Sequence, residues 1–170
     1  MRLIILGAGG FGRTAADAAE QMHVFSQIDF LDDRGKGENI LGPCNTFSEY
    51  MGENTVFYPA FGNSDLRMQW LDAITRAGAR STVIMHPRAY CSPKAKVEAG
   101  SILLPGAIVN TDTIVHRGCI INLGAIVDHG CVLEEGIHVC VGAIVKAENR
   151  LPKLMKVEAG EVIENRTYPL

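Results

Sequence analysis

The sequence predicts two domains: an α/β nucleotide-binding domain over residues 1–88 and a parallel β-helix over residues 89–170. One observation is a repeat, because residues 97–150 divide into nine consecutive hexapeptides, and a fixed short period is typical of stacked coils. The other is a glycine-rich segment between an apolar run and an Ala-rich run, followed by a second apolar run that ends in two aspartates. That order is typical of a β-α-β unit that binds a nucleotide.

The first predicted strand, residues 3–6, runs directly into GAGGFG, which satisfies G-x-G-x-x-G. Glycines here let the backbone approach a phosphate, and the start of the helix expected over residues 14–22 offers N–H groups and a positive dipole end. A second strand, residues 28–31, is followed by carboxylates placed to accept from a ribose hydroxyl or a base. The expected nucleotide-binding residues here are Gly7, Gly9, Gly10, Gly12, Asp32 and Asp33. A tight strand-to-helix turn without a ligand is the alternative, since the motif is short.

The first domain then continues with a strand, a helix and a strand. Residues 55–61 predict the third strand, and the GNSDLR segment after it adds Gly62 and Asn63 to the expected nucleotide site. Asn63 or Ser64 is placed to cap the helix that follows. Residues 81–85 predict a fourth strand. A segment of this length holds only one half of a dinucleotide fold, so a nucleotide diphosphate suits it better than NAD.

The hexapeptides share one pattern of positions. The first residue is always aliphatic, the fifth is mostly small, and the fourth is Gly in seven of the nine repeats, with Asp112 and Glu148 as exceptions. Side chains alternate along a strand, so the first and fifth positions face inward, and the fourth-position glycine permits a corner. Three corners close a triangular coil, so the repeats predict three stacked coils. A meander of antiparallel strands would need longer alternating runs.

The outward positions predict an oligomer. Two columns on adjacent faces are apolar: Ile102 and Ile120 on one face, and Ile108, Ile126 and Ile144 on the next. Soluble monomers seldom expose such stripes, and a triangular prism offers three-fold packing, so a homotrimer is expected. His129 falls in a corner between the third face and the first, whereas His138 falls on the second face. These two imidazoles can therefore share a site only across a subunit boundary.

Composition excludes several classes of protein. The net charge is -3 and 47% of residues are hydrophobic, a balance without the basic excess of a nucleic-acid-binding protein. The start MRLIILGAGG indicates a strand rather than a signal peptide or a membrane-spanning helix, so we expect a cytoplasmic protein that does not insert into a membrane. The five cysteines lack paired metal-ligand spacing, so free thiols and no bound metal are expected.

Asn122, His129, His138 and Gly142 lie in NLGAIVDHGCVLEEGIHVCVGA, and further motifs are GAGGFG, FLDD and FGNSDLR. Together these segments resemble the NeuD/PglD-like group of sialic-acid O-acetyltransferases and UDP-amino-sugar N-acetyltransferases, over nearly the whole chain. The resemblance implies a left-handed β-helix, a trimer, a nucleotide-sugar substrate in the N-terminal domain, and acetyl-CoA as co-substrate between neighbouring helices.

The resemblance also assigns roles. His129 matches the general base that takes a proton from the sugar amine or hydroxyl, Asn122 matches a polar residue near the acceptor, and His138 and the Gly142 backbone match positions beside the thioester. An imidazole suits the first role because it titrates near neutral pH.

The sequence departs from the group at two places. Family members usually carry an acidic residue directly after the catalytic histidine, where this sequence has Gly130, with Asp128 before the histidine and Glu134 nearby. The second departure follows Gly142, where the chain passes to a segment resembling the family's closing segment with roughly two coils missing before it.

Three function hypotheses remain open at this point. An acyltransferase acting on a nucleotide-linked sugar in surface glycan synthesis leads, and a nucleotide-sugar-binding trimer without transferase activity, because of the shortened helix, is the alternative. A zinc-dependent β-helix hydratase would need His116 with the other two histidines, whose spacing does not match that class. An NAD-dependent dehydrogenase lacks a second nucleotide-binding half. The sequence leaves the sugar, the acyl group and the choice of N- or O-transfer open.

Overall fold

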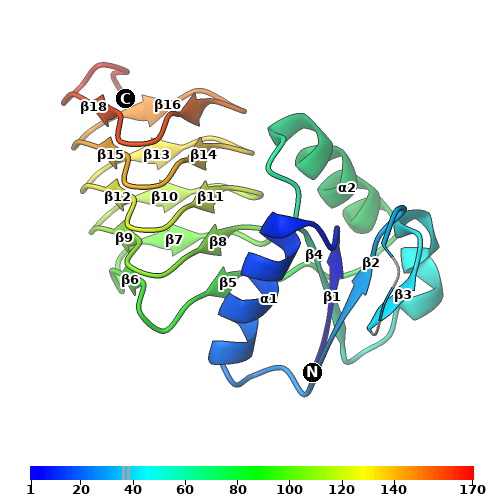
Figure 1. The fold of residues 1–170 in the computed structure, drawn as a ribbon. Coiled ribbons are helices and arrows are strands. Elements are labelled where there is room, and N and C mark those ends of the chain that lie inside the picture. The colour runs from blue at the N-terminus through cyan, green and yellow to red at the C-terminus, as the bar shows by residue number, and fades with distance from the viewer. Residues whose placement is uncertain (36, 38) are drawn as a thin grey trace. The chain divides into compact units, whose positions relative to one another are not determined.

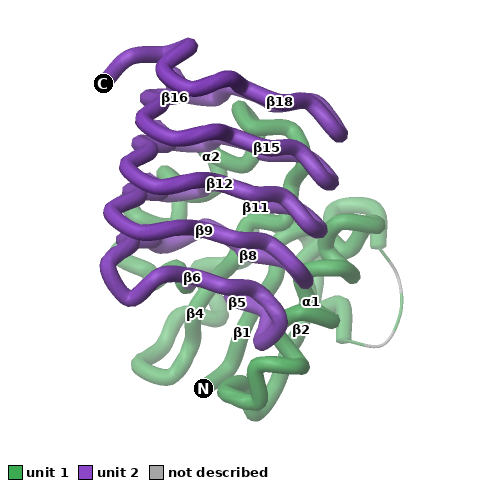
Figure 2. Tube along the Cα trace, turned by 90° about the vertical axis from the view of Figure 1, so that its left-hand side faces the viewer, with its two compact units in different colours: residues 1–82 green, residues 83–170 purple. Residues whose placement is uncertain are grey.

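The structure is a computed structural model, and it describes residues 1–35, 37 and 39–170. The chain forms two compact units, residues 1–82 and 83–170, which Figure 2 distinguishes by colour. The first is an α/β unit and the second is a left-handed parallel β-helix, the fold class that the sequence predicts.

The α/β unit is built on one parallel sheet in the order β3-β2-β1-β4 (Figure 1). Its strands are β1 (Arg2–Leu6), β2 (Gln27–Leu31), β3 (Ile40–Gly42) and β4 (Thr55–Pro59). Its helices are α1 (Gly10–Gln21), α2 (Ser64–Arg76) and the 3-10 helix η1 (Cys44–Tyr50). β1 lies between β2 and β4 and is buried from its second residue to its last, because a central parallel strand is covered on both faces.

One predicted strand of this unit is wrong, and one was missed. Residues 81–85 were expected to join the α/β sheet, but only Ser81 forms a bridge there, to Phe57. Strand β5 (Ile84–Met85) instead pairs with a strand of the β-helix. The fourth strand of the α/β sheet is β3, whose three residues are too short to give a periodic signal.

The β-helix consists of two-residue strands in three parallel sheets, one for each face (Figures 1 and 2). The first face holds β7 (Lys96–Val97), β10 (Ile114–Val115), β13 (Val132–Leu133) and β16 (Arg150–Leu151). The second face holds β5, β8 (Ile102–Leu103), β11 (Ile120–Ile121), β14 (His138–Val139) and β17 (Lys156–Val157). The third face holds β6 (Tyr90–Cys91), β9 (Ile108–Val109), β12 (Ile126–Val127), β15 (Ile144–Val145) and β18 (Val162–Ile163).

The repeat predicts the interior of this unit correctly. Strands on one face pair with a register of 18 residues, as Ile126 does with Ile144. The first-position aliphatic residues and the fifth-position small residues form a single buried cluster. Asp112 and Glu148, which replace glycine at two corners, adopt the same positive φ as the glycines, 58° and 57°.

The β-helix is longer than the nine hexapeptides indicate. It begins at β5 and runs to β18, and the predicted closing segment continues the coil. Leu151, Val157 and Ile163 are buried on the inner column, while the fourth positions Leu154 and Arg166 take corner φ values of 65° and 57°. The pattern was missed because Gly occupies only one of these late corners.

The two outward apolar columns differ in exposure. Ile102 and Ile120 have no exposed surface. The column of Ile108, Ile126 and Ile144 is only partly buried. Cys140, directly after β14, is also buried, and burial is the main cause that raises the pKa of its thiol. No helix within the described residues is long and apolar enough to cross a membrane.

Candidate active site

The glycine-rich loop lies where β1 passes into α1, at the carboxyl end of the sheet. Gly7 has a φ of +98°, a conformation that favours glycine. A Cβ on Gly12 would lie 1.9 Å from the Gly7 carbonyl oxygen. These two glycines are therefore required by the fold itself, whatever the loop binds.

Gly9 and Gly10 are different, because a Cβ at either position would meet no atom within 4 Å. Gly9 is the N-cap of α1, has an ordinary φ of -69° and receives no side-chain cap. Both residues are exposed. The fold does not need a glycine at these two positions, which fits their predicted role of leaving room for a ligand.

Asp32, at the end of β2, uses both carboxylate oxygens to accept hydrogen bonds from backbone N–H groups, whereas the sequence predicts that it binds a ribose hydroxyl or a base. Its Oδ2 accepts the Ala8 N–H at 2.7 Å, and its Oδ1 accepts the N–H groups of Arg34 and Gly35 at 2.8 and 2.7 Å. These bonds, that of Ala8 foremost, hold the pKa of the carboxyl below its usual value against the opposing effect of burial. Asp32 therefore ties the glycine loop to the loop after β2.

Asp33 lies beside it with a simpler environment. The side chain is exposed, and its Oδ1 accepts the N–H of Cys44 at 2.8 Å. The Cys44 thiol donates to the Leu31 carbonyl, and burial is the first cause that raises its pKa to about 11. The thiol forms part of a pocket wall and is no nucleophile at neutral pH.

Two neighbouring hollows open on either side of Asp32 and Arg34. One, of about 330 Å³, is lined by Ala8, Gly9, Arg13, Asp32, Arg34, Gly35 and Ile40. The other, of about 320 Å³, is lined by Asp32, Asp33, Arg34, Cys44, Phe61 and Leu66. Arg34, which is not among the nucleotide-binding residues expected from the sequence, lines both hollows. A guanidinium beside the glycine loop can bind a phosphate through two N–H groups.

The segment after β4 is fixed by a cap and a buried arginine. Asn63 is the N-cap of α2 and its Oδ1 accepts the Leu66 N–H at 2.8 Å, as predicted. Arg67 is fully buried and donates to the Phe61 carbonyl at 2.7 Å and to Ser64 Oγ at 3.1 Å. Sequence reasoning missed Arg67, although its place in the first turn after the cap points it back toward this loop.

We expect Asp32→Asn to remove a pH-dependent part of the stability. Because the folded pKa is lowered, the contribution of Asp32 is complete above its ordinary value of 3.8 and is lost as the pH falls through the folded value. The free energy of unfolding, measured with urea from pH 3 to pH 7, should be higher for wild type than for the variant. This difference should be constant near pH 7 and should become smaller below about pH 4. Asp17→Asn, at an exposed helix position, serves as the control; a difference independent of pH would contradict this role.

In the β-helix, His129 occupies the exposed corner between β12 and β13. Its N–H donates to Asp128 Oδ1 at 2.7 Å, and its carbonyl accepts the Glu148 N–H at 3.1 Å. The Asp128 oxygen also accepts from Asn110 Nδ2 at 3.0 Å. The imidazole thus projects from a corner whose backbone is bonded on both sides.

Asn122 and His138 form a pair on the second face. Asn122 Nδ2 lies 3.0 Å from His138 Nε2, and each side chain is partly buried. β11 and β14 stack directly, so a residue just after β11 reaches the outward side chain of β14. The structure therefore brings Asn122 to His138, whereas the resemblance placed Asn122 with His129 in one acceptor site.

The backbone N–H of Gly142 forms a hydrogen bond with the preceding coil of the β-helix. That N–H donates to the Leu123 carbonyl at 2.9 Å, and the residue is an exposed corner with a φ of +64°. Its N–H is therefore not available to a thioester in this arrangement, and any role at that position falls to its carbonyl or its small size.

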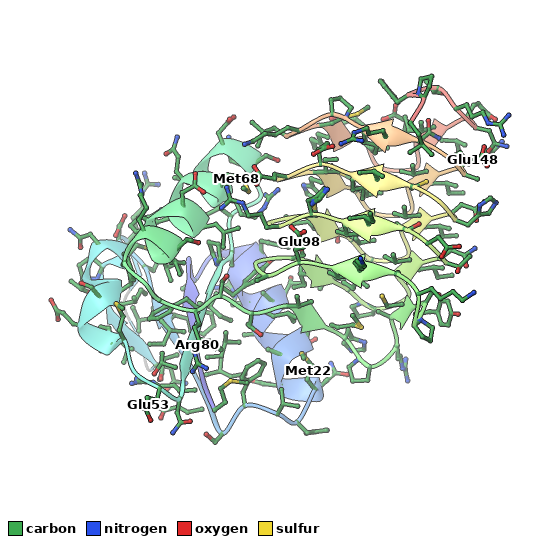
Figure 3. All side chains as sticks on the ribbon, turned by 180° about the vertical axis from the view of Figure 1, so that it is seen from behind. Met22, Glu53, Met68, Arg80, Glu98 and Glu148 are labelled. Atoms are coloured by element: carbon green, nitrogen blue, oxygen red, sulfur yellow. The ribbon has the colours of Figure 1, made fainter. Side chains whose placement is uncertain are left out.

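The acidic residues near His129 differ in what they bind. Glu134 pairs with Arg150 at 2.6 Å. Glu148 lies at the outer corner of its coil (Figure 3) and pairs with Arg166 at 2.5 Å. Of the carboxylates considered as substitutes for the missing acid at Gly130, Asp128 is the one bonded to His129. His116, the third histidine of the hydratase hypothesis, pairs with Glu98 at 3.1 Å. Within the described residues of one chain there is no group of three possible metal ligands.

Known proteins share both the N-terminal unit and the whole architecture. Residues 2–74 match the family model of the PglD N-terminal domain. The acetyltransferase domain of PglB from Neisseria gonorrhoeae, solved with acetyl coenzyme A, is 28% identical with a TM-score of 0.94, and the match covers 97% of this chain and 82% of that one.

Two more distant structures share the fold. A variant of perosamine N-acetyltransferase from Caulobacter crescentus, in complex with CoA and GDP-perosamine, is 19% identical with a TM-score of 0.83, over 97% of this chain and 89% of that one. WeeI from Acinetobacter baumannii is 16% identical with a TM-score of 0.57, over 95% and 96%.

The fold defines a hexapeptide-repeat protein in which an N-terminal α/β unit with a glycine-rich loop precedes a parallel β-helix. Within that class, the N-terminal unit matches the PglD N-terminal domain, and the chain as a whole is similar to the acetyltransferase domain of PglB, in line with the resemblance that its motifs show.

Proposed function

We propose that the protein transfers an acetyl group from acetyl-CoA to the amine or hydroxyl of a nucleotide-linked sugar. The observation that carries this proposal is the match over 97% of the chain to an acetyltransferase domain solved with acetyl coenzyme A. The GDP-perosamine in a second relative of the same fold supports a nucleotide sugar as the acceptor.

The chemistry assigned to the β-helix is direct transfer. His129 takes the proton as the sugar nitrogen or oxygen attacks the thioester carbonyl, an effect worth about 10²- to 10⁴-fold in rate. The carbon–sulfur bond of the thioester then breaks, and CoA leaves as its thiol with the proton that His129 took. No acyl-enzyme is required, because a base and two substrates held in line suffice. Asn122 and His138, which lie within hydrogen-bonding distance of each other, offer polar groups to the acetyl donor or the acceptor.

The nucleotide part of the substrate is assigned to the N-terminal unit. Gly9 and Gly10 leave room at the start of α1, where free N–H groups and the positive helix end favour a diphosphate. Asp33, Gly62 and Asn63 border the same end of the sheet, and Arg34 lines both hollows there. Asp32 serves this site by fixing the loop that carries Ala8.

The complete transfer site is proposed to need a second copy of the chain. His129 is at the corner after the third face, and His138 is on the second, so one coil keeps them on different sides of the prism. The third face also carries the partly buried column of Ile108, Ile126 and Ile144, which a neighbouring copy would cover. A homotrimer in the cytoplasm fits this geometry and the free state of the cysteines.

An equimolar mixture of His129→Ala and His138→Ala chains, unfolded and refolded together, tests the shared site. Mixed assemblies recreate some sites that hold both imidazoles, so activity should exceed the sum of the two separate variants. A mixture no more active than its parts would show that each chain uses its own histidines, and sedimentation in the same buffer gives the number of chains.

Calorimetric titration separates this proposal from the alternative of a nucleotide-sugar-binding protein without activity. Acetyl-CoA and the UDP- and GDP-linked amino sugars are titrated separately. Binding of both partners supports the transferase. Binding of the sugar nucleotide with no heat from acetyl-CoA supports the alternative, in which the shortened β-helix has lost the groove for the pantetheine chain.

A further inference from the structure

A buried hydroxyl inside the β-helix bonds the backbone on both sides of His129. Thr113 is fully buried in the coil before that of His129. Its Oγ1 donates to the Asp128 carbonyl at 2.8 Å and accepts the Cys131 N–H at 3.3 Å. The two bonded groups flank the pair formed by His129 and Gly130, so the corner is anchored from within at both ends.

A carboxylate anchors the same corner from outside. Asp128 Oδ1 accepts the His129 N–H at 2.7 Å and Asn110 Nδ2 at 3.0 Å. The bond from the His129 N–H is the main cause that lowers the pKa of Asp128, and Asn110 and the charge on His129 act in the same direction. Asp128 therefore stays ionised at neutral pH, next to the residue that acquires a positive charge when it takes a proton.

We propose that Thr113 and Asp128 are positioning residues for His129, and that Asp128 supplies the negative charge that Gly130 cannot. This inference rests on the proposed function, in which His129 is the general base. Thr113 fixes the path of the corner, and Asp128 fixes the His129 N–H while its charge stabilises the imidazolium formed during transfer. The other two nearby carboxylates, Glu134 and Glu148, form ion pairs with Arg150 and Arg166. Asp128 is therefore the carboxylate that we assign to this role.

The chain offers a matched control at another corner. Ser101 is also fully buried, its Oγ donates to the His116 carbonyl at 3.1 Å, and it accepts the Cys119 N–H at 3.1 Å. Ser101 thus makes hydrogen bonds equivalent to those of Thr113, but at a different corner from that of His129. Loss of the Ser101 hydroxyl should therefore lower the stability of the β-helix in the same way without changing the position of His129.

The test compares kcat and KM for Thr113→Val, Asp128→Ala and Ser101→Ala at a temperature where all three are folded. We expect Thr113→Val and Asp128→Ala to lower kcat about 10- to 100-fold with little change in either KM, while Ser101→Ala keeps the wild-type kcat. Thr113→Ser, which keeps the hydroxyl, should have a kcat close to that of wild type. Asp128→Asn, which keeps an acceptor but not the charge, should fall between wild type and Asp128→Ala.

Each result bears on one of the two proposals. If wild type transfers acetyl and needs His129, yet Thr113→Val and Asp128→Ala keep the wild-type kcat, the positioning inference is wrong and the proposed function stands. If wild type transfers nothing to any nucleotide amino sugar, the proposed function is wrong. Backbone ¹⁵N relaxation of residues 128–131 then still tests the anchoring: we expect added motion in Thr113→Val and none in Ser101→Ala, and equal relaxation in both variants would overturn it.

Discussion

Replacing His129 with glutamine should lower the rate of acetyl transfer about 10²- to 10⁴-fold while leaving the fold and both binding steps intact. The residue is exposed at a corner, and its recorded hydrogen bonds are made by its backbone. Glutamine keeps those backbone bonds and removes only the group that can accept a proton near neutral pH. The measurement is kcat with saturating acetyl-CoA and sugar nucleotide, together with the two dissociation constants.

His23→Gln is the control for this prediction. His23 is also exposed, but it lies in the α/β unit between α1 and β2. We expect its kcat to match that of wild type. A His129→Gln protein that transfers acetyl at the wild-type rate would remove the proposed base from the mechanism.

Replacing Gly12 with alanine should destabilise the N-terminal unit by about 3 kcal/mol or more, the upper range of overpacking. The added Cβ would lie 1.9 Å from the Gly7 carbonyl oxygen and 2.8 Å from its carbonyl carbon. Both contacts are with backbone, which cannot move aside as a flexible side chain can, and Gly7 itself has a φ of +98°. The thermal unfolding of the variant, followed by circular dichroism, measures the effect.

Gly9→Ala is the matched substitution in the same loop. Its Cβ would enter open space, and its φ of -69° suits any residue. We expect its melting temperature to equal that of wild type and its affinity for the sugar nucleotide to fall, because the methyl group occupies the side where a diphosphate would approach. Equal melting temperatures for the Gly12 and Gly9 variants would contradict the packing argument.

The repeat made the β-helix predictable because each position has one physical task. An aliphatic first residue and a small fifth residue must fill the interior of every coil, and that demand is visible in sequence whatever the tertiary context. Corners are less visible, because residues other than glycine adopt the positive φ at several of them, including Leu154 and Arg166. The repeat therefore does not predict the last coils, whose sequence resembles a closing segment.

The candidate site was predictable as a set of residues but not as a set of contacts. Strand alternation predicts that Asn122, His129 and His138 lie on the surface, but it does not predict that Asn122 pairs with His138. Nor does the glycine-loop motif predict that the carboxylate oxygens of Asp32 accept backbone N–H groups. Such bonds depend on side-chain rotamers and on neighbouring coils. The repeat predicts only that a fifth-position residue such as Thr113 faces inward, because the hydrogen bonds of its hydroxyl cannot be inferred from a repeat.

The most direct test of the account is a transfer assay with purified wild-type protein, acetyl-CoA and a panel of UDP- and GDP-linked amino sugars. Release of the CoA thiol and the mass of the sugar product are followed together. The account predicts thiol release that depends on one sugar nucleotide, with an acetylated sugar as product in equal amount. Tight binding of that sugar nucleotide with neither thiol release nor acetylated product would contradict it.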